Sequence, residues 1–366
     1  DIVFGDWSSD VCSSDLGLLV LGMPVGLRAS ADNAVLAWNA LMLDAIRGET
    51  TGPTLSTRNL AILHAAIFDA VNSVDRGHQP YRFQFDAPPG TSAAAAAASA
   101  GRVVMRALYP SMDGATEGRY RELLEALPES TATTQGIELG FEMAAAFLNS
   151  RMSDGSSTAV PYIPSTEPGQ WLRTPPFYRP PMDPHWRYVE LFCLEDKEPY
   201  VAPGPPGLDS AEYAAAFEEV KSLGAAYSSV RSQEQGDIAI FWSDFSYTAM
   251  PPGHWHQIAA SIARERQSSL VECARLLAWL SLVQADAAIV CWEGKYRHNF
   301  WRPVTAIWRA DEDGNRETAA DGEWDHFLVS PNFPEYPSGH STFSKASAQV
   351  LTRFFETDAK IGRAHV

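Results

Sequence analysis

The sequence predicts an all-α, bundle-like protein, and three observations lead to that prediction. Apolar residues recur at helical spacing along most of the chain, almost nothing alternates with a period of two, and the prolines concentrate in one stretch. Hydrophobic residues make up 45% and charged residues 20% of the 366 residues, which is the composition of a globular protein. Amphipathic helices packed around a core are the architecture that this pattern favours.

The predicted helices form two groups, with a proline-rich loop between them. Twelve of the 25 prolines lie between Pro161 and Pro206, which excludes regular structure there. Aromatic residues within this stretch indicate a loop packed over a core. We expect helices at about residues 34–48, 56–74, 92–108, 117–127 and 131–151, then at 210–226, 233–245, 254–264 and 268–296, with a last one after Ser338.

The chain divides into six predicted segments. Residues 32–152 form an N-terminal helical region, 153–209 the proline-rich loop, and 210–360 a C-terminal helical region with an incomplete second bundle. Residues 17–31 are interpreted as a signal-peptide remnant, because an apolar run precedes the small residues Ala29-Ser30-Ala31. This predicts a periplasmic or secreted protein. Residues 1–16 and 361–366 resemble translated adapter sequence, and we interpret both as artefacts.

Charge and composition exclude several classes of protein. The formal net charge is −17, from 28 basic and 45 acidic residues, so binding of nucleic acid through phosphate contacts is not expected. No uninterrupted apolar run has the roughly 18 residues that a membrane span requires. Four cysteines are too few for a disulfide-stapled scaffold of this length. The oligomeric state has no signature in the sequence.

The first motif that can carry chemistry is Lys295-Tyr-Arg-His-Asn-Phe-Trp-Arg302-Pro303. On a continuous helix, seven positions bring Lys295 and Arg302 within about 20° of one face, roughly two turns apart. We therefore expect an ammonium and a guanidinium group on the same side of a helix end. Basic residues are also common at helix C-termini because they interact favourably with the helix dipole, so the pair alone is compatible with a structural role.

The second motif is Phe333-Pro-Glu-Tyr-Pro-Ser338-Gly339-His340. Ser338 is the expected N-cap of the following helix, and Gly339 allows a ligand to approach the free amides of its first turn. His340 lies in that turn, where the helix dipole disfavours its protonated form and a bound anion favours it. An ordinary capped helix also fits this motif taken alone.

Together the motifs supply what a tetrahedral oxyanion requires: two fixed cations, backbone donors and a titratable histidine. K-x-x-x-x-x-x-R-P followed about 35 residues later by P-S-G-H resembles the vanadium-dependent haloperoxidase and type-2 phosphatidic acid phosphatase superfamily. Trp292, the Phe300-Trp-Arg-Pro run and Phe333 are similar to the chloroperoxidase-like branch of the haloperoxidases. Residues 64–81 and 241–259 also resemble bacterial haloperoxidases.

The resemblance implies a helical-bundle fold, vanadate as cofactor, and oxidation of halide by hydrogen peroxide to hypohalous acid, which halogenates a small organic substrate. The residues that would bind vanadate oxygens are Lys295, Arg302, Ser338 and Gly339. Lys295 would also polarise a bound peroxide, and His340 would act as the acid–base residue that helps to deprotonate it. Phe333 and Trp292 would line the side from which halide approaches.

The family's third motif, an arginine six residues before the histidine that bonds vanadium, has no counterpart in this sequence. Arg363 and His365 are only two positions apart, so we do not assign them this role. Loss of a charge-assisted contact costs about 1.5–3 kcal/mol, and the missing metal–nitrogen bond adds to that. We therefore expect this chain, as a C-terminally truncated family member, to bind vanadate weakly or not at all and to be weakly active or inactive.

Three other interpretations stay open. An acid phosphatase of the same superfamily would hold phosphate in the same cradle, and Trp292 and Phe333 lead us to favour a haloperoxidase. A non-catalytic helical fragment would keep the packing and lose the chemistry. A metal site at His254 and His256 is disfavoured, because side chains two residues apart on a helix point about 200° away from each other; contact of His254 with a substrate loop fits better. Halide preference and the organic substrate have no readable motif.

Overall fold

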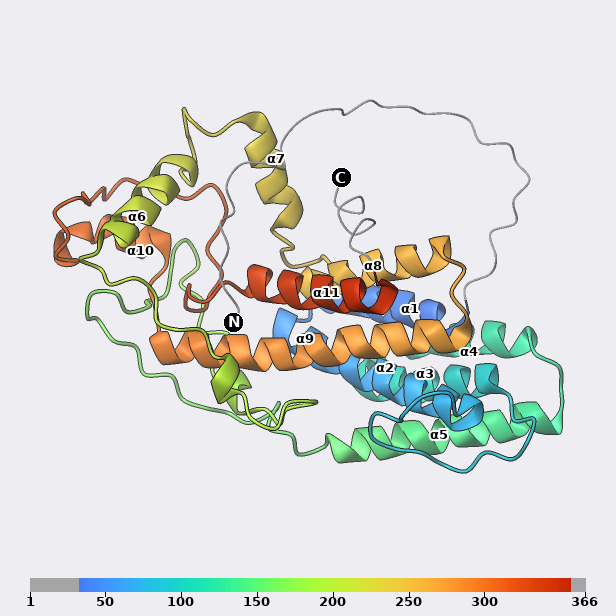
Figure 1. The fold of residues 1–366 in the computed structure, drawn as a ribbon. Coiled ribbons are helices and arrows are strands. Elements are labelled where there is room, and N and C mark those ends of the chain that lie inside the picture. Colours follow the sequence, from blue (N-terminus) through green and yellow to red (C-terminus); the bar gives the residue numbers. More distant parts are fainter. Residues whose placement is uncertain (1–32, 357–366) are drawn as a thin grey trace, which may run out of the picture. The chain divides into compact units, whose positions relative to one another are not determined.

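The computed structural model describes residues 33–356, and within them it confirms the predicted all-α fold (Figure 1). In this part of the chain the regular elements are helices, accompanied by two isolated β-bridges, Gln170–Phe300 and Ala225–His326. The segments predicted at residues 1–16, 17–31 and 361–366 lie outside the described residues.

The helices before the proline-rich segment begin and end close to their predicted positions. Side-chain oxygens of Asn33, Ser92 and Ser130 accept hydrogen bonds from the first-turn N–H groups of three of them, which explains where these helices begin. Proline at the first position explains a fourth. The elements are α1 (Ala34–Gly48), α2 (Pro53–Asp75), α3 (Ala93–Leu108), η1 (Pro110–Met112), α4 (Asp113–Glu125) and α5 (Thr131–Ser150).

The second group of helices follows an irregular segment that contains only short 3₁₀ turns, η2 (Trp186–Tyr188) and η3 (Glu198–Tyr200). Ser338 caps the last helix as predicted. A six-residue helix, α10, was not predicted, because so short an element has no measurable period. The elements are α6 (Ala211–Leu223), α7 (Gln233–Trp242), α8 (Met250–Glu265), α9 (Leu270–His298), α10 (Pro303–Trp308), η4 (Ala310–Glu312) and α11 (Gly339–Phe355).

Helix α9 is the central element of the packing. It contacts α2, α8 and α11, and it runs antiparallel to α11 (Figure 1). Its residues Leu276, Leu277 and Leu280 are fully buried. By length and composition alone α9 could cross a membrane, but 72% of its apolar window is buried inside the protein. The burial is what a core helix requires.

Two buried aspartates attach loop segments to this core. Asp69 of α2 accepts hydrogen bonds from the backbone N–H groups of residues 81, 82 and 83 at 2.7, 2.9 and 2.8 Å. Asp286 of α9 accepts from those of residues 192, 193 and 194 at 2.6, 2.8 and 2.9 Å. A buried carboxylate needs such donors to offset its lost hydration. The proline-rich segment is therefore fixed to α9 and is not a free linker.

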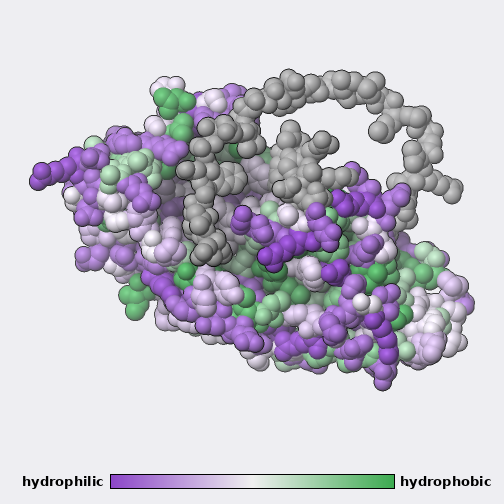
Figure 2. All heavy atoms as spheres, in the orientation of Figure 1, coloured by the Kyte–Doolittle hydropathy of each residue, from purple (hydrophilic) through white to green (hydrophobic). Residues whose placement is uncertain are grey.

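The surface is largely hydrophilic, with exposed apolar side chains gathered around α7. Figure 2 shows hydrophobic residues at the end of the segment that leads into this helix. Val230 is 61% exposed, and Ile240 and Phe241 on α7 are 56% and 58% exposed. Single exposed apolar residues are ordinary, but here several of them lie on or beside one helix, α7, whose residues are mostly exposed.

Glycines on α5 allow it to pack closely on α3, which gives a test of the fold. A Cβ at Gly140 would lie 2.2 Å from the carbonyl oxygen of Ala96, whereas one at Gly118 on α4 would meet nothing within 4 Å. We predict that Gly140→Ala lowers the free energy of unfolding by about 1–3 kcal/mol through overpacking. The matched control, Gly118→Ala, should raise it by about 0.5–1 kcal/mol through helix propensity. Urea denaturation measures both, and equal effects would contradict the packing described.

Candidate oxyanion site

Both motifs line one cavity of about 80 Å³ at the N-terminal end of α11, alongside the C-terminal half of α9. One water needs roughly 10–15 Å³ of such volume, so the cavity has room for a small polyatomic ion. The structure brings together every residue that the sequence assigned to the site: Trp292, Lys295, Arg302, Phe333, Ser338, Gly339 and His340. The lining also includes Pro53, Pro251, Pro331, Glu335 and Phe343, which sequence reasoning did not single out.

Lys295 and Arg302 do not lie on one continuous helix, so the spacing argument for their common face was wrong. Helix α9 ends at His298, and Asn299 adopts the left-handed conformation with φ 49°. Arg302 is extended, with φ −86° and ψ 154°, and it precedes α10 as its N-cap. Pro303 disfavours a helical Arg302. The two cations meet because the chain turns at Asn299.

Lys295 is a buried ammonium group, only 1% exposed. Its Nζ donates hydrogen bonds to the carbonyl oxygens of Pro334 at 3.0 Å, Glu335 at 2.9 Å and Pro337 at 2.6 Å. An ammonium has three donors, and these contacts use all of them to hold the turn before Ser338 against α9. Burial lowers the pKa of Lys295 to about 8.

Gly294 makes room for this turn. A Cβ at this position would lie 2.8 Å from Cδ of Pro337, closer than side-chain atoms normally approach. Gly294 was not among the predicted site residues. Its position inside a long helical pattern, directly before Lys295, was the signal in the sequence that could have identified it.

Two of the three guanidinium nitrogens of Arg302 donate hydrogen bonds within the protein, and the third has no acceptor in the part of the chain that the structure describes. Its side chain is 9% exposed. Nε donates to the carbonyl oxygen of Phe333 at 2.8 Å, and Nη1 donates to Oε2 of Glu335 at 2.5 Å. Nη2 is buried and has no hydrogen-bond partner among the described residues. Because buried donors are normally paired, Nη2 is the donor of Arg302 that a bound ligand would satisfy.

Glu335 places a carboxylate among the cations. Burial raises its pKa, but Arg302 and Lys295 outweigh burial and hold the pKa of Glu335 below its usual range. The group is therefore ionised at neutral pH, and it partly neutralises the two cations. Glu335 was not among the predicted site residues.

Phe333 forms a wall that both cations face. Lys295 Nζ and Arg302 Cζ each lie 4.8 Å from the centroid of its ring. The Trp292 ring lies 5.2 Å from it and is buried. Cations over an aromatic face interact favourably when water is excluded. These two aromatic side chains make one side of the cavity apolar.

The first turn of α11 supplies backbone donors. Ser338 Oγ accepts from the N–H of Ser341 at 3.2 Å, which is the capping contact. The first N–H groups of a helix have no intrahelical acceptor. A Cβ at Gly339 would lie 3.9 Å from Phe343 and 4.0 Å from Lys295, so the absence of a side chain leaves that space to the cavity.

His340 is exposed at the rim of the cavity. Its Nε2 lies 3.3 Å from the carbonyl oxygen of Ser243, in the loop between α7 and α8. A carbonyl can only accept, so this contact assigns the ring hydrogen to Nε2 and leaves Nδ1 as an acceptor. In the same loop, Asp244 lies 3.3 Å from Nδ1 of His254.

His254 and His256 face different surroundings. His254 contacts Asp244, in the loop that also contacts His340. His256 is fully buried, stacks on His64 with ring centroids 5.2 Å apart, and lies 2.8 Å from Oδ1 of Asn39. Burial lowers the pKa of His256 to about 3, so it is neutral. His254 therefore packs against the rim loop, and His256 belongs to the core packing.

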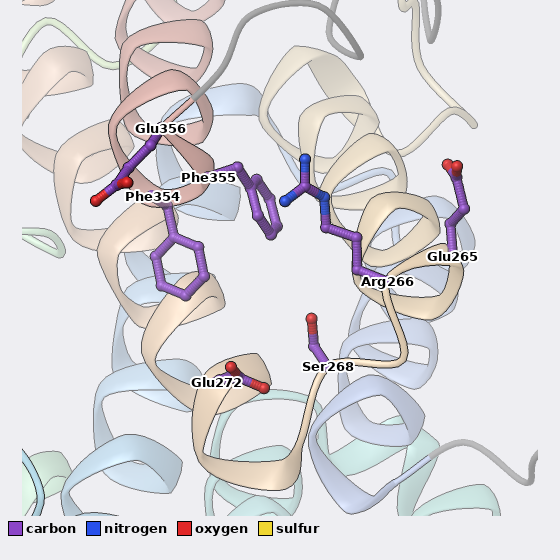
Figure 3. Close-up of a pocket in the computed structure, with 7 residues that line it drawn as sticks. All are labelled: Glu265, Arg266, Ser268, Glu272, Phe354, Phe355 and Glu356. Atoms are coloured by element: carbon purple, nitrogen blue, oxygen red, sulfur yellow. The ribbon is translucent and has the colours of Figure 1, made fainter.

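A larger pocket of about 560 Å³ lies at the other end of α11 (Figure 3). Its lining includes three carboxylates and one guanidinium, from Glu265, Glu272, Glu356 and Arg266. Helix α11 has 17 residues, which is a length of about 25 Å. The pocket is therefore remote from both motifs, and its acidic lining disfavours an oxyanion.

Comparison with known proteins shows which proteins this chain is similar to. Residues 275–365 match the family model of the VCPO second helical-bundle domain. The chain is 26% identical over 409 aligned residues to the vanadium chloroperoxidase of Curvularia inaequalis, covering 88% of this chain and 66% of the relative. This chain thus spans just under two thirds of that protein's length.

Solved structures show the same fold. The structure described as the first bacterial vanadium-dependent iodoperoxidase superposes with a TM-score of 0.76 at 24% identity, covering 88% of this chain and 80% of the other. The structure of a holo-type bacterial vanadium-dependent chloroperoxidase superposes with a TM-score of 0.67 at 18% identity. The match covers 91% of this chain and 83% of the other. The fold is that of the vanadium haloperoxidases, and the resemblance to their family that the two motifs indicated is confirmed.

The pKa of Lys295 predicts how oxyanion binding depends on pH. Lys295 is charged below about pH 8 and loses its charge as the pH rises through that value. We predict that the affinity for inorganic phosphate, measured calorimetrically, falls between about pH 8 and 10. Phosphate becomes more negative as the pH rises toward this range, which by itself would strengthen its binding to a cation. A fall in affinity therefore reports the loss of positive charge on Lys295. Lys295→Met should bind more weakly and lack this fall; an unchanged or rising wild-type affinity would argue against the assignment.

Proposed function

We propose that this cavity binds vanadate and that the protein is a haloperoxidase-like enzyme, which uses hydrogen peroxide to oxidise halide to hypohalous acid. The observation that carries the proposal is the buried, unpartnered Nη2 of Arg302, next to Lys295 and to the open N-terminus of α11. A fixed guanidinium donor and first-turn amides are what a tetrahedral oxyanion binds. The similarity to vanadium chloroperoxidase supports vanadate as that oxyanion.

The residues present fit the oxyanion part of such a site. Nη2 of Arg302 has no partner among the described residues to give up, whereas Lys295 must exchange a carbonyl oxygen for a ligand oxygen. Vanadate, when bound, supplies Lewis-acid chemistry. Of the described residues lining the cavity, His340 is the one imidazole, and it lies at the rim. Binding therefore depends on charge and hydrogen bonds, and we propose weak affinity for vanadate in this chain.

Each side chain has a separate task in the proposed reaction. Arg302 and Lys295 neutralise the oxyanion and hold its orientation. His340 accepts a proton from hydrogen peroxide at Nδ1, the ring atom that its contact with Ser243 leaves available. Phe333 and Trp292 keep one side of the cavity dry, which favours a weakly hydrated halide and a small organic substrate over water. We also propose a periplasmic or secreted location, based on the apolar run in residues 17–31, which lie outside the described residues.

Bromination of monochlorodimedone with vanadate, peroxide and bromide tests the proposal. We predict slow bromination by the protein alone. Added imidazole should raise the rate at least about tenfold, because it supplies a nitrogen ligand, whereas the one imidazole among the described lining residues, His340, lies at the rim and is assigned to proton transfer. Arg302→Ala should reduce the rate about 100-fold through loss of a fixed cationic donor.

Two controls make this result specific. Arg309→Ala removes a guanidinium that pairs with Glu312 away from the cavity, and it should leave the rate unchanged. Vanadate and imidazole without protein give the background. Hydrolysis of p-nitrophenyl phosphate without bromination would instead identify a phosphatase. Absence of both reactions together with absence of vanadate binding would identify a non-catalytic helical protein.

A further inference from the structure

Glu335 introduces a negative charge into a cavity whose other polar groups favour an anion. From its position we infer that Glu335 makes the site select oxyanions that carry a proton, such as hydrogen phosphate and hydrogen vanadate, over fully deprotonated ones such as sulfate. This selectivity rests on the oxyanion-binding function proposed above and specifies which oxyanions the same site accepts.

The backbone fixes Glu335 beside the ligand donors. Its N–H donates to the carbonyl oxygen of Phe300 at 2.9 Å, and its own carbonyl oxygen accepts from Lys295 at 2.9 Å. The carboxylate therefore cannot leave the cavity by a shift of the main chain while these contacts hold. Arg302 Nη1 binds its Oε2 at 2.5 Å, which restrains the side chain as well.

The shared guanidinium brings the carboxylate and a ligand oxygen together. Nη1 of Arg302 is engaged by Glu335, and Nη2 of the same planar group is unpartnered. An oxygen bound at Nη2 is therefore a neighbour of the carboxylate. Oε1 of Glu335 has no hydrogen-bond donor among the described residues, so it is available to accept a hydrogen bond from a ligand.

Whether the ligand oxygen carries a proton decides whether its contact with the Glu335 carboxylate is favourable. Two deprotonated oxygens side by side repel each other, and the repulsion weakens binding of sulfate. A ligand that carries a proton donates it to Glu335 in a charge-assisted O–H···O⁻ hydrogen bond. Sites built to hydrogen-bond a ligand hydroxyl reject analogues that lack the hydroxyl by about 10⁴- to 10⁵-fold. The Glu335 side chain is 37% exposed, so water screens part of the effect, and we expect about 100-fold.

The test compares inorganic phosphate with sulfate by isothermal titration calorimetry at about pH 7.5, where both are mainly dianions and differ in one proton. The wild-type protein should bind phosphate about 100-fold more tightly than sulfate. Glu335→Gln should bring the two affinities within about tenfold, mainly by strengthening sulfate binding, because an amide can donate as well as accept. Glu312→Gln, an identical change in an exposed pair with Arg309, should leave the ratio unchanged.

Other results would overturn the inference. If the wild-type protein binds phosphate and sulfate equally well, the inference is wrong, and no variant is needed to show it. An equal gain for both anions in Glu335→Gln would show that the carboxylate acts only through its charge. Glu335→Asp keeps the acceptor and should retain more discrimination than Glu335→Gln. If vanadate and phosphate bind but sulfate binds equally well, the selectivity alone is wrong; if no oxyanion binds, the proposed function fails with it.

Discussion

The whole site depends on one buried ammonium group and the three carbonyl oxygens around it. Lys295 extends from α9 and binds the backbone of residues 334, 335 and 337, which leads directly into the N-cap of α11. A buried charge is tolerated only when hydrogen bonds replace its hydration. The need to satisfy this ammonium therefore fixes the position of the second motif relative to the first. Gly294 serves the same contact by leaving space for Pro337.

The balance of charge around Lys295 explains how an acidic protein can hold an anion. The chain carries a formal charge of −17, but surface charges are screened beyond roughly 8 Å at physiological salt. Inside the cavity, Lys295 and Arg302 face one carboxylate, that of Glu335, so the local charge is positive. The apolar wall of Phe333 and Trp292 strengthens these interactions by excluding water. The proposed oxyanion binding thus depends on local contacts and not on net charge.

The sequence predicted the helices and the members of the site better than it predicted the geometry that joins them. Helical periodicity and capping residues such as Ser92 and Ser338 act locally, so they can be read from a single sequence. Lys295 and Arg302 share the cavity as expected, but through a turn at Asn299 that a continuous helix did not anticipate. Glu335 and the anchoring role of Asp286 depend on partners far along the chain, and no local pattern reveals them.

We propose that Lys295, Arg302 and the start of α11 form one oxyanion site. A crystal structure of the protein soaked with vanadate is the decisive experiment. We predict tetrahedral density within hydrogen-bond distance of Arg302 Nη2 and of the first-turn amides, with at least one Lys295–carbonyl contact exchanged for a ligand oxygen. Density only in the acidic pocket at the far end of α11, or an empty cavity with all three Lys295 contacts intact, would contradict it.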